Sequence, residues 1–148
     1  QMARMLRKSP ELRTDHEVVV RKAPGSDVAR VDPDGMRQVF WNLASNALRA
    51  MPRGGRLEIE IGGHGVDEVM VCFRDQGCGM DEEAIKRYFQ PFGSGFQGGT
   101  GLGAAIVYRI VDEHGGRVQA VSPPGEGTEI RLILPNAPAG VAAAVAAQ

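Results

Sequence analysis

Residues 34–51 read DGMRQVFWNLASNALRAM, and this stretch decides the fold class. Its apolar residues recur every three or four positions, which is the spacing of one face of an α-helix. The members of this stripe are Met36, Val39, Phe40, Leu43, Ala47 and Ala50. PRGG at 52–55 follows and predicts the end of the helix. Because a helix with one apolar face buries that face, we expect a second layer of structure against it.

A second face of the same helix is polar. Asn42, Asn46 and Arg49 lie at i, i+4 and i+7, within roughly 60° of arc beside the apolar stripe. Polar residues on a surface helix often form no more than a solvated face. Two amides and a cation are equally suited to a hydrated Mg²⁺ ion and the oxygen atoms of phosphate. These residues alone leave both interpretations open.

Strands and shorter helices are predicted around this helix. Clean alternation predicts a half-buried strand at 56–62, and the more apolar run at 68–75 predicts a more central one. The other predicted elements are helices at 81–89 and 104–114, a hairpin of 117–122 with 128–135, and a hairpin of 17–20 with a stretch near 27–31. The fold class that follows is α+β, with about three helices layered against one face of a sheet.

Composition excludes several classes of protein. The 148 residues, 43% hydrophobic and 24% charged, are ordinary for one globular domain, and the net charge of −1 gives no bias toward nucleic acid or anionic membranes. No apolar run approaches the roughly 18 residues that span a bilayer. Cys72 and Cys78 are too few for a disulfide framework. We therefore expect a cytoplasmic domain without nucleic-acid or membrane contacts.

Two glycine-rich loops could bring the backbone close to a ligand. GGTGLG at 98–103 precedes a predicted helix, and the N–H groups at a helix start favour phosphate. Glycine leaves these donors open because it has no Cβ, although such a loop is often only a connector. DQGCGM at 75–80 follows the predicted central strand. The carboxylate of Asp75 could accept a hydrogen bond from the amino group of a base, or it could simply cap the turn.

Taken in order, these segments resemble the motifs of a known family, the ATP-binding catalytic domain of bacterial sensor histidine kinases. QVFWNLASNALRAM (38–51) looks like its N box, DQGCGM (75–80) its first glycine box, YFQPF (88–92) its F box and GGTGLGAAIV (98–107) its second glycine box. GEGTEIRLILP (125–135) resembles its final strands. The family lies in the GHKL superfamily with gyrase and MutL-type ATPases. The resemblance implies the Bergerat fold, a two-layer α/β sandwich with a mixed, mostly antiparallel sheet.

The resemblance also implies a site for Mg-ATP between the N-box helix and the glycine-rich loops. Asp75 would bind the adenine amino group, and Asn46 would hold a Mg²⁺ ion that bridges the phosphates. Asn42 would assist Asn46, and Arg49 would contact phosphate, so these three form the implied catalytic set. The remaining implied nucleotide contacts are Gly77 and Gly79 around the adenine, Thr128 near it, and Gly99, Gly101, Leu102 and Gly103 along the phosphates.

Asn42 distinguishes two activities within the superfamily. Members that hydrolyse ATP typically carry a glutamate here, which activates water as a general base. An amide cannot accept that proton, so Asn42 indicates transfer of the γ-phosphoryl group to a separate nucleophile by positioning and electrostatic stabilisation. The alternatives are an ATP-hydrolysing switch, a serine kinase of the anti-sigma-factor type, and a degenerate nucleotide-sensing or partner-binding module. The last is suggested by Gly93–Phe96, where many of these kinases carry a Thr-Lys pair in the lid (about 80–98).

The phosphorylated histidine is not predicted within this chain. None of its three histidines lies in the H-[ED]-x-x-x-P helix context of a phosphoacceptor. We expect 14–135 to be the ATP-binding domain, 1–13 a linker or the end of a preceding helix, and 136–148 a flexible alanine-rich tail. The expected partners are a phosphoacceptor histidine domain of the same parent protein and a response regulator downstream of it. The isolated domain is expected to be a monomer, and the parent protein could be anchored in a membrane.

Overall fold

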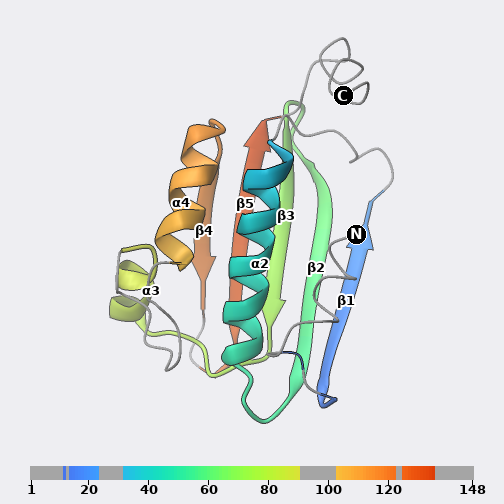
Figure 1. Cartoon of the computed structure of the whole chain (residues 1–148), viewed down its shortest axis with the longest axis vertical. Coiled ribbons are helices and arrows are strands. Elements are labelled where there is room, and N and C mark those ends of the chain that lie inside the picture. Colours follow the sequence, from blue (N-terminus) through green and yellow to red (C-terminus); the bar gives the residue numbers. More distant parts are fainter. Residues whose placement is uncertain (1–11, 13, 24–31, 91–102, 123–124, 136–148) are drawn as a thin grey trace.

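The structure, a computed structural model, describes residues 12, 14–23, 32–90, 103–122 and 125–135. In chain order these residues form β1 (His16–Lys22), α2 (Pro33–Arg49), β2 (Gly55–His64), β3 (Glu68–Asp75), α3 (Glu82–Tyr88), α4 (Gly103–Glu113), β4 (Arg117–Val121) and β5 (Thr128–Pro135). The strands make one sheet in the order β1-β2-β3-β5-β4 (Figure 1). The β1–β2 pair is parallel and the other pairs are antiparallel, which confirms the predicted mixed, mostly antiparallel sheet.

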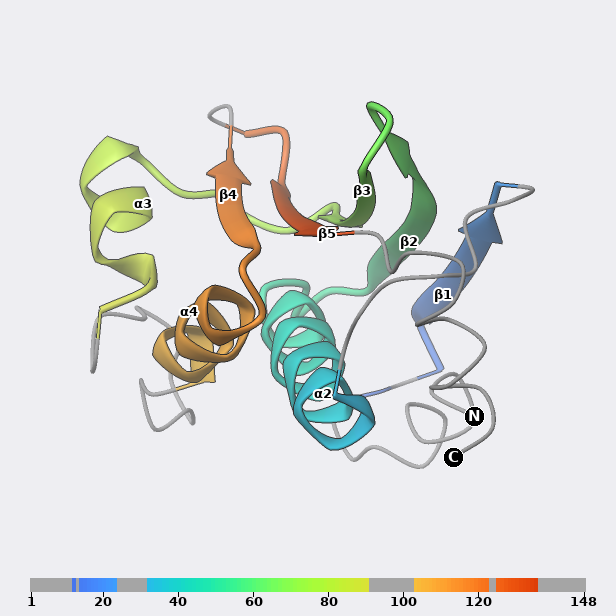
Figure 2. The ribbon, with the colours of Figure 1, turned by 90° about the horizontal axis from the view of Figure 1, so that it is seen from above.

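The helices and the sheet form two layers. α2 and α4 lie side by side on one face of the sheet, and α3 lies beyond the β4 edge next to α4 (Figure 2). The core fills the space between the layers. Its sheet side consists of Leu57, Ile59, Val71, Phe73, Ile130, Leu132 and Leu134, and its helix side is built mainly from α2 and α4. β3 is the middle strand, as its apolar sequence predicts.

α2 begins where the sequence provides a cap. Asp32 is extended, and its carboxylate accepts a hydrogen bond from the backbone N–H of Gly35 at 3.0 Å. Pro33 occupies the first helical position, where no backbone donor is needed. Residues 43–48 of this helix are all buried, since α2 contacts β2 and β3 on one side and α4 on another. α2 is therefore the central helix, and its polar residues lie inside the molecule.

β1 makes a pairing that the sequence does not suggest. The strand forms, but it lies parallel to β2, with Val18 opposite Leu57. Parallel strands need a crossover connection, and here α2 provides it. The other arm of the suggested hairpin (27–31) lies outside the described residues, as do the expected linker and tail apart from Leu12. Alternation along a strand shows which face is buried but not which strand is its neighbour, so the sequence did not indicate the parallel pair.

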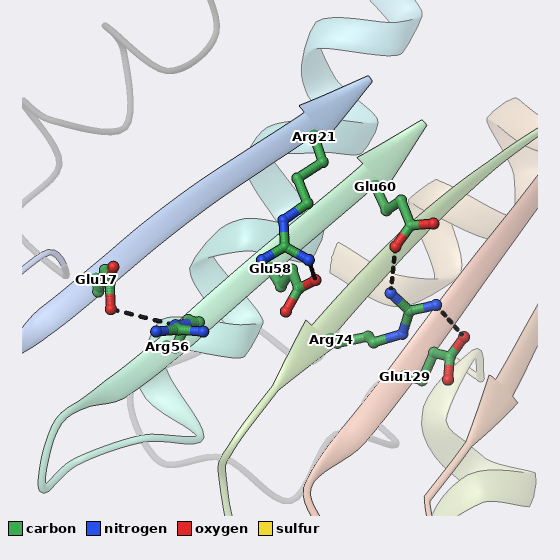
Figure 3. A network of polar contacts seen from close by, with 7 residues as sticks. All are labelled: Glu17, Arg21, Arg56, Glu58, Glu60, Arg74 and Glu129. Carbon is green, nitrogen blue, oxygen red and sulfur yellow. Dashed lines mark hydrogen bonds and ion pairs between the residues drawn. The ribbon is translucent and has the colours of Figure 1, made fainter. Parts of the chain in front are cut away.

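The face of the sheet opposite the helices is polar. Alternation along β2 directs Leu57 and Ile59 into the core and Glu58 and Glu60 to the other face. Ion pairs join neighbouring strands there (Figure 3), namely Arg56–Glu17 at 3.2 Å, Arg21–Glu58 at 3.0 Å, Arg74–Glu60 at 2.8 Å and Arg74–Glu129 at 3.5 Å. Exposed pairs of this kind contribute about 0–1 kcal/mol each, so they favour the strand register more than they stabilise the fold.

Hydrogen bonds of His114 connect the end of α4 with the start of α2. The backbone N–H of Asp32 lies 2.8 Å from Nε2 of His114, and Nδ1 of the same ring lies 2.6 Å from the carbonyl oxygen of Ile110. A backbone N–H only donates and a carbonyl only accepts. The ring must therefore carry its proton on Nδ1 and accept at Nε2, which is the neutral form.

The substitution His114→Ala should lower the free energy of unfolding by about 1 kcal/mol, because the N–H at the start of α2 loses its acceptor. Urea unfolding followed by circular dichroism measures the change. His64→Ala is the matched control, since the His64 side chain makes no hydrogen bond within the described residues. Equal losses in the two variants would contradict the role given to His114.

Candidate functional site

A small pocket lies between α2, α3 and the ends of β3 and β5. It is lined by Leu43, Asn46, Ala47, Phe73, Asp75, Met80, Tyr88, Thr128 and Ile130. Three of the predicted nucleotide contacts, Asn46, Asp75 and Thr128, therefore lie around one hollow. Its volume is about 10 Å³, room for roughly one water-sized sphere, which is less than a purine occupies.

Asp75 is the last residue of β3 and faces the pocket. Its Oδ1 accepts hydrogen bonds from the backbone N–H groups of Gly77 at 2.9 Å and Thr128 at 3.3 Å. Both bonds use the same oxygen, and within the described residues Oδ2 has no hydrogen-bond partner. Burial raises the pKa of Asp75, and the two N–H donors partly oppose that effect. The carboxylate thus presents one open acceptor.

Two glycines allow the turns around Asp75 to pack closely. A Cβ on Gly77 would lie 2.5 Å from the carbonyl oxygen of Ala50, at the end of α2. A Cβ on Gly127 would overlap the carbonyl oxygen of Asp75, and the backbone there has a φ of +80°. Gly79, with a φ of +74°, lies in the same turn as Gly77. The first glycine box therefore positions the Asp75 carboxylate by packing against α2.

Ser122 connects three parts of the site, although no sequence motif marks it. Its Oγ accepts a hydrogen bond from the N–H of Met80 at 2.6 Å, donates to the carbonyl of Gly127 at 2.8 Å and lies 3.1 Å from Oγ1 of Thr128. A hydroxyl donates one hydrogen bond, and the Ser122 hydroxyl donates it to the carbonyl of Gly127. The hydroxyl of Thr128 must therefore donate to Ser122. The lone pairs of the Thr128 hydroxyl are then left to accept from other groups.

Asn46 is held at both ends of its amide. Its side chain is buried, its Oδ1 accepts a hydrogen bond from Nη2 of Arg49 at 2.5 Å, and its Nδ2 donates to the hydroxyl of Tyr88 at 3.2 Å. Burial raises the pKa of Tyr88 to about 12, so this hydroxyl stays protonated at neutral pH. Tyr88 belongs to the F-box segment, but no pattern in the sequence indicates a role for its hydroxyl. The amide oxygen of Asn46 therefore faces the positively charged guanidinium of Arg49, just as the oxygen ligand of a metal faces a cation.

Two members of the predicted catalytic set each carry a buried donor that has no acceptor among the described residues. Nδ2 of Asn42 and Nε of Arg49 make no hydrogen bond in the described part of the chain. A buried donor without an acceptor is costly, and phosphate oxygens are acceptors that both groups fit. Asn42 also lies beside the first residue of α4, because a Cβ on Gly103 would be 3.6 Å from its Cγ. The remaining predicted positions, namely Gly99, Gly101, Leu102 and the part of the expected lid from residue 91 onward, which includes Gly93–Phe96, lie outside the described residues.

Comparison with known proteins assigns the family. Residues 31–138 match the family described as histidine kinase-, DNA gyrase B- and HSP90-like ATPase. The chain belongs to this ATPase family. Sporulation kinase E of Bacillus subtilis (strain 168) is 38% identical over 104 residues, covering 70% of this chain and 14% of that protein. Sensor histidine kinase ZraS of Klebsiella oxytoca is 40% identical over 106 residues, covering 72% and 23%. The chain thus spans less than a quarter of the length of these two relatives.

Solved structures agree with this assignment. The mycobacterial sensor histidine kinase MprB superposes with a TM-score of 0.78 at 28% identity, covering 93% of both chains. Full-length ShkA in complex with AMPPNP superposes with a TM-score of 0.80 at 28% identity, covering 94% of this chain and 29% of that one. The predicted fold and the predicted family are confirmed. In the described part of the chain, no helix has the length and apolar character needed to cross a membrane.

Replacing Ser122 should be far more damaging than replacing another buried serine. Ser122→Ala removes a group with three partners, so we expect the free energy of unfolding to fall by about 2–3 kcal/mol in urea titrations. Ser45→Ala is the matched control, because Oγ of Ser45 is also buried but has no hydrogen-bond partner among the residues that the structure describes. That substitution should be neutral or slightly stabilising. Similar losses in both variants would contradict the network drawn for Ser122.

Proposed function

We propose that this domain binds Mg-ATP and transfers the γ-phosphoryl group to a histidine on a phosphoacceptor domain of the same parent protein, as part of two-component signalling. One observation carries the proposal. A single pocket is lined by Asp75, with one open carboxylate oxygen, and by Asn46, whose amide oxygen faces a cation. These are the groups that the two ends of ATP need. The AMPPNP complex of ShkA, a protein of the same fold, supports nucleotide binding by this fold.

The base end of the site is built from acceptors. Oδ2 of Asp75 would accept from the exocyclic amine of adenine, and Oγ1 of Thr128, whose proton goes to Ser122, offers a second acceptor nearby. Gly77 and Gly79 shape the turn that carries this carboxylate. The acceptors of Asp75 and Thr128 favour a base with an amino group over one with a carbonyl at the same place.

The phosphate end would use donors and one metal ligand. Nδ2 of Asn42 and Nε of Arg49 would pair with phosphate oxygens, and the backbone of Gly99, Gly101, Leu102 and Gly103 would follow the phosphates. Oδ1 of Asn46 is the oxygen that would hold Mg²⁺. When bound there, Mg²⁺ would neutralise negative charge on the phosphates. For this ligand, Arg49 must turn from the Asn46 oxygen toward phosphate.

Transfer is supported over hydrolysis by what surrounds the pocket. Among its described lining residues Asp75 is the one carboxylate. Its Oδ1 is occupied by the N–H groups of Gly77 and Thr128, and its Oδ2 is the oxygen assigned to adenine. Asn42 cannot take a proton from water at neutral pH. The acceptor would be a histidine of the parent protein, and a response regulator would receive the phosphoryl group from it. The proposal places a monomeric domain in the cytoplasm, where ATP is available.

Asp75→Asn should change which base the site prefers. The Asn oxygen must take the place of Oδ1, since Gly77 and Thr128 both donate there, so an amide NH₂ replaces the open oxygen. Two donors then face each other when adenine binds. We expect calorimetry to show an ATP affinity at least about tenfold lower, with ITP bound better than ATP by the variant. Unchanged preference for ATP would contradict the contact assigned to Asp75.

The stability of the same variant is the control. The folded protein raises the pKa of Asp75 above 3.8, the value in the unfolded chain. At pH values between 3.8 and the raised pKa, the folded protein therefore binds more protons than the unfolded chain. Its free energy of unfolding therefore falls as the pH rises through this window. Asparagine does not titrate, so Asp75→Asn should lack this decline and be at least as stable as the parent at pH 7. If Asp75→Asn instead loses much of its stability at pH 7, its weaker ATP binding would be a result of misfolding and not of the lost contact with adenine.

The isolated chain should bind Mg-ATP without phosphorylating itself on histidine. Nε2 of His16 is bonded to the carbonyl of Met51 at 2.8 Å, both ring nitrogens of His114 are engaged, and His64 lies at the end of β2. Incubation with radiolabelled ATP should give no acid-labile label on the chain, and the label should appear on the upstream region of the parent protein when that region is added. Steady release of phosphate well above background would instead favour the ATP-hydrolysing switch, and absence of ATP binding would favour a degenerate module.

A further inference from the structure

Tyr88 is a buried polar side chain in the pocket that the proposed mechanism does not use. It is the last residue of α3, and its side chain is 4% exposed among the residues of the core. The chain has two tyrosines, and the other, Tyr108 on α4, is 52% exposed. Burying a hydroxyl is costly unless it finds a partner. The partner of Tyr88 is the amide of Asn46.

The orientation of that amide follows from the chemistry of its two neighbours. A guanidinium only donates, so the atom of Asn46 that faces Arg49 at 2.5 Å must be the oxygen. The nitrogen of the amide then faces Tyr88, at 3.2 Å from the hydroxyl. Because an amide nitrogen only donates, the oxygen of Tyr88 is the acceptor. The Tyr88 hydroxyl therefore holds the nitrogen side of the amide, which is turned away from the guanidinium of Arg49.

In this structure the side-chain oxygen of Asn46 already faces a positive charge, the guanidinium of Arg49. If Arg49 pairs with phosphate, Tyr88 is the remaining partner that the described residues provide for the Asn46 amide. Without the Tyr88 hydroxyl, Nδ2 would be buried without an acceptor, and the amide could rotate to find one. Its oxygen would then leave the direction of the cation.

We propose that the Tyr88 hydroxyl is a positioning group for a metal ligand. By accepting the Nδ2 hydrogen bond of Asn46, it keeps Oδ1 directed at the divalent cation that accompanies a nucleoside triphosphate. Tyr88 itself touches neither the cation nor the phosphates. This inference rests on the proposed function, because it takes Asn46 to be the ligand of Mg²⁺. Partners that orient a metal ligand commonly affect metal affinity strongly when they are removed.

The test compares Tyr88→Phe with Tyr108→Phe, which is the same chemical change at an exposed site. ATP binding is titrated calorimetrically over a range of Mg²⁺ concentrations and again in EDTA. For Tyr88→Phe, the Mg²⁺ concentration at half-maximal enhancement of ATP binding should rise about tenfold. Affinity for ATP in EDTA should remain unchanged, and Tyr108→Phe should match the parent in both measurements. An unchanged Mg²⁺ requirement in Tyr88→Phe, or an equal loss with and without Mg²⁺, would overturn the proposal.

A double-mutant cycle tests whether Tyr88 acts through Asn46. In an Asn46→Ala background, Tyr88→Phe should have no further effect on the Mg²⁺ requirement. An additional loss of similar size there would overturn the positioning role. Absence of any ATP binding by the parent chain would instead defeat the proposed function, so the two failures are distinguishable.

A measurement on the unsubstituted chain covers the case in which Tyr88→Phe does not fold. In the Mg-ATP complex, nuclear magnetic resonance should show a nuclear Overhauser contact between the side-chain NH₂ of Asn46 and the ring of Tyr88. The resonances of that NH₂ group are assigned by their loss in Asn46→Ala. A complex that lacks this contact would overturn the proposal.

Discussion

The structure depends on one constraint, which is that the middle of α2 is buried on all sides and still carries polar side chains. Residues 43–48 of the helix are enclosed by the sheet and by α4, and Asn46 is among them. Such an amide is tolerated only when its donor and acceptor are both satisfied. Arg49 satisfies the oxygen from the next turn of the helix, and Tyr88 satisfies the nitrogen from α3. The need to satisfy this amide thus brings the end of α3 into the core.

A second polar group is arranged by the end of a strand. Phe73 and Asp75 are two residues apart on β3, so both side chains point toward α2, one into the core and one into the pocket at its edge. The turns around the carboxylate then close on it. Gly77 packs against the end of α2, Gly127 packs against Asp75 itself, and Ser122 links Met80, Gly127 and Thr128. One layer interface consequently holds both Asp75 and Asn46, the groups proposed to bind adenine and the cation.

The two faces of the sheet carry different kinds of residues. The helix-covered face carries the core and the pocket, whereas the opposite face carries paired glutamates and arginines on β1, β2, β3 and β5 (Figure 3). Opposite charges are therefore interspersed among the described residues of that face, and their ion pairs join neighbouring strands. It also follows that changes on it should affect strand register and solubility more than nucleotide binding.

The sequence by itself determined most of the elements and the fold class, and it singled out Asn46, Asp75 and Thr128, which line one pocket. The apolar stripe of α2, the alternation along β2 and the ordered glycine-rich motifs are local patterns, and local patterns can be read without coordinates. Only the tertiary structure decided that β1 runs parallel to β2, and that Ser122 and Tyr88 belong to the site. Strand neighbours and hydrogen-bond partners are contacts between residues distant in the chain, and no spacing in the sequence encodes them. The polar face of α2 shows the same division. Spacing placed Asn42, Asn46 and Arg49 together, but only the tertiary packing buried the Asn46 side chain, Nδ2 of Asn42 and Nε of Arg49, and within the described residues it left the last two donors without an acceptor.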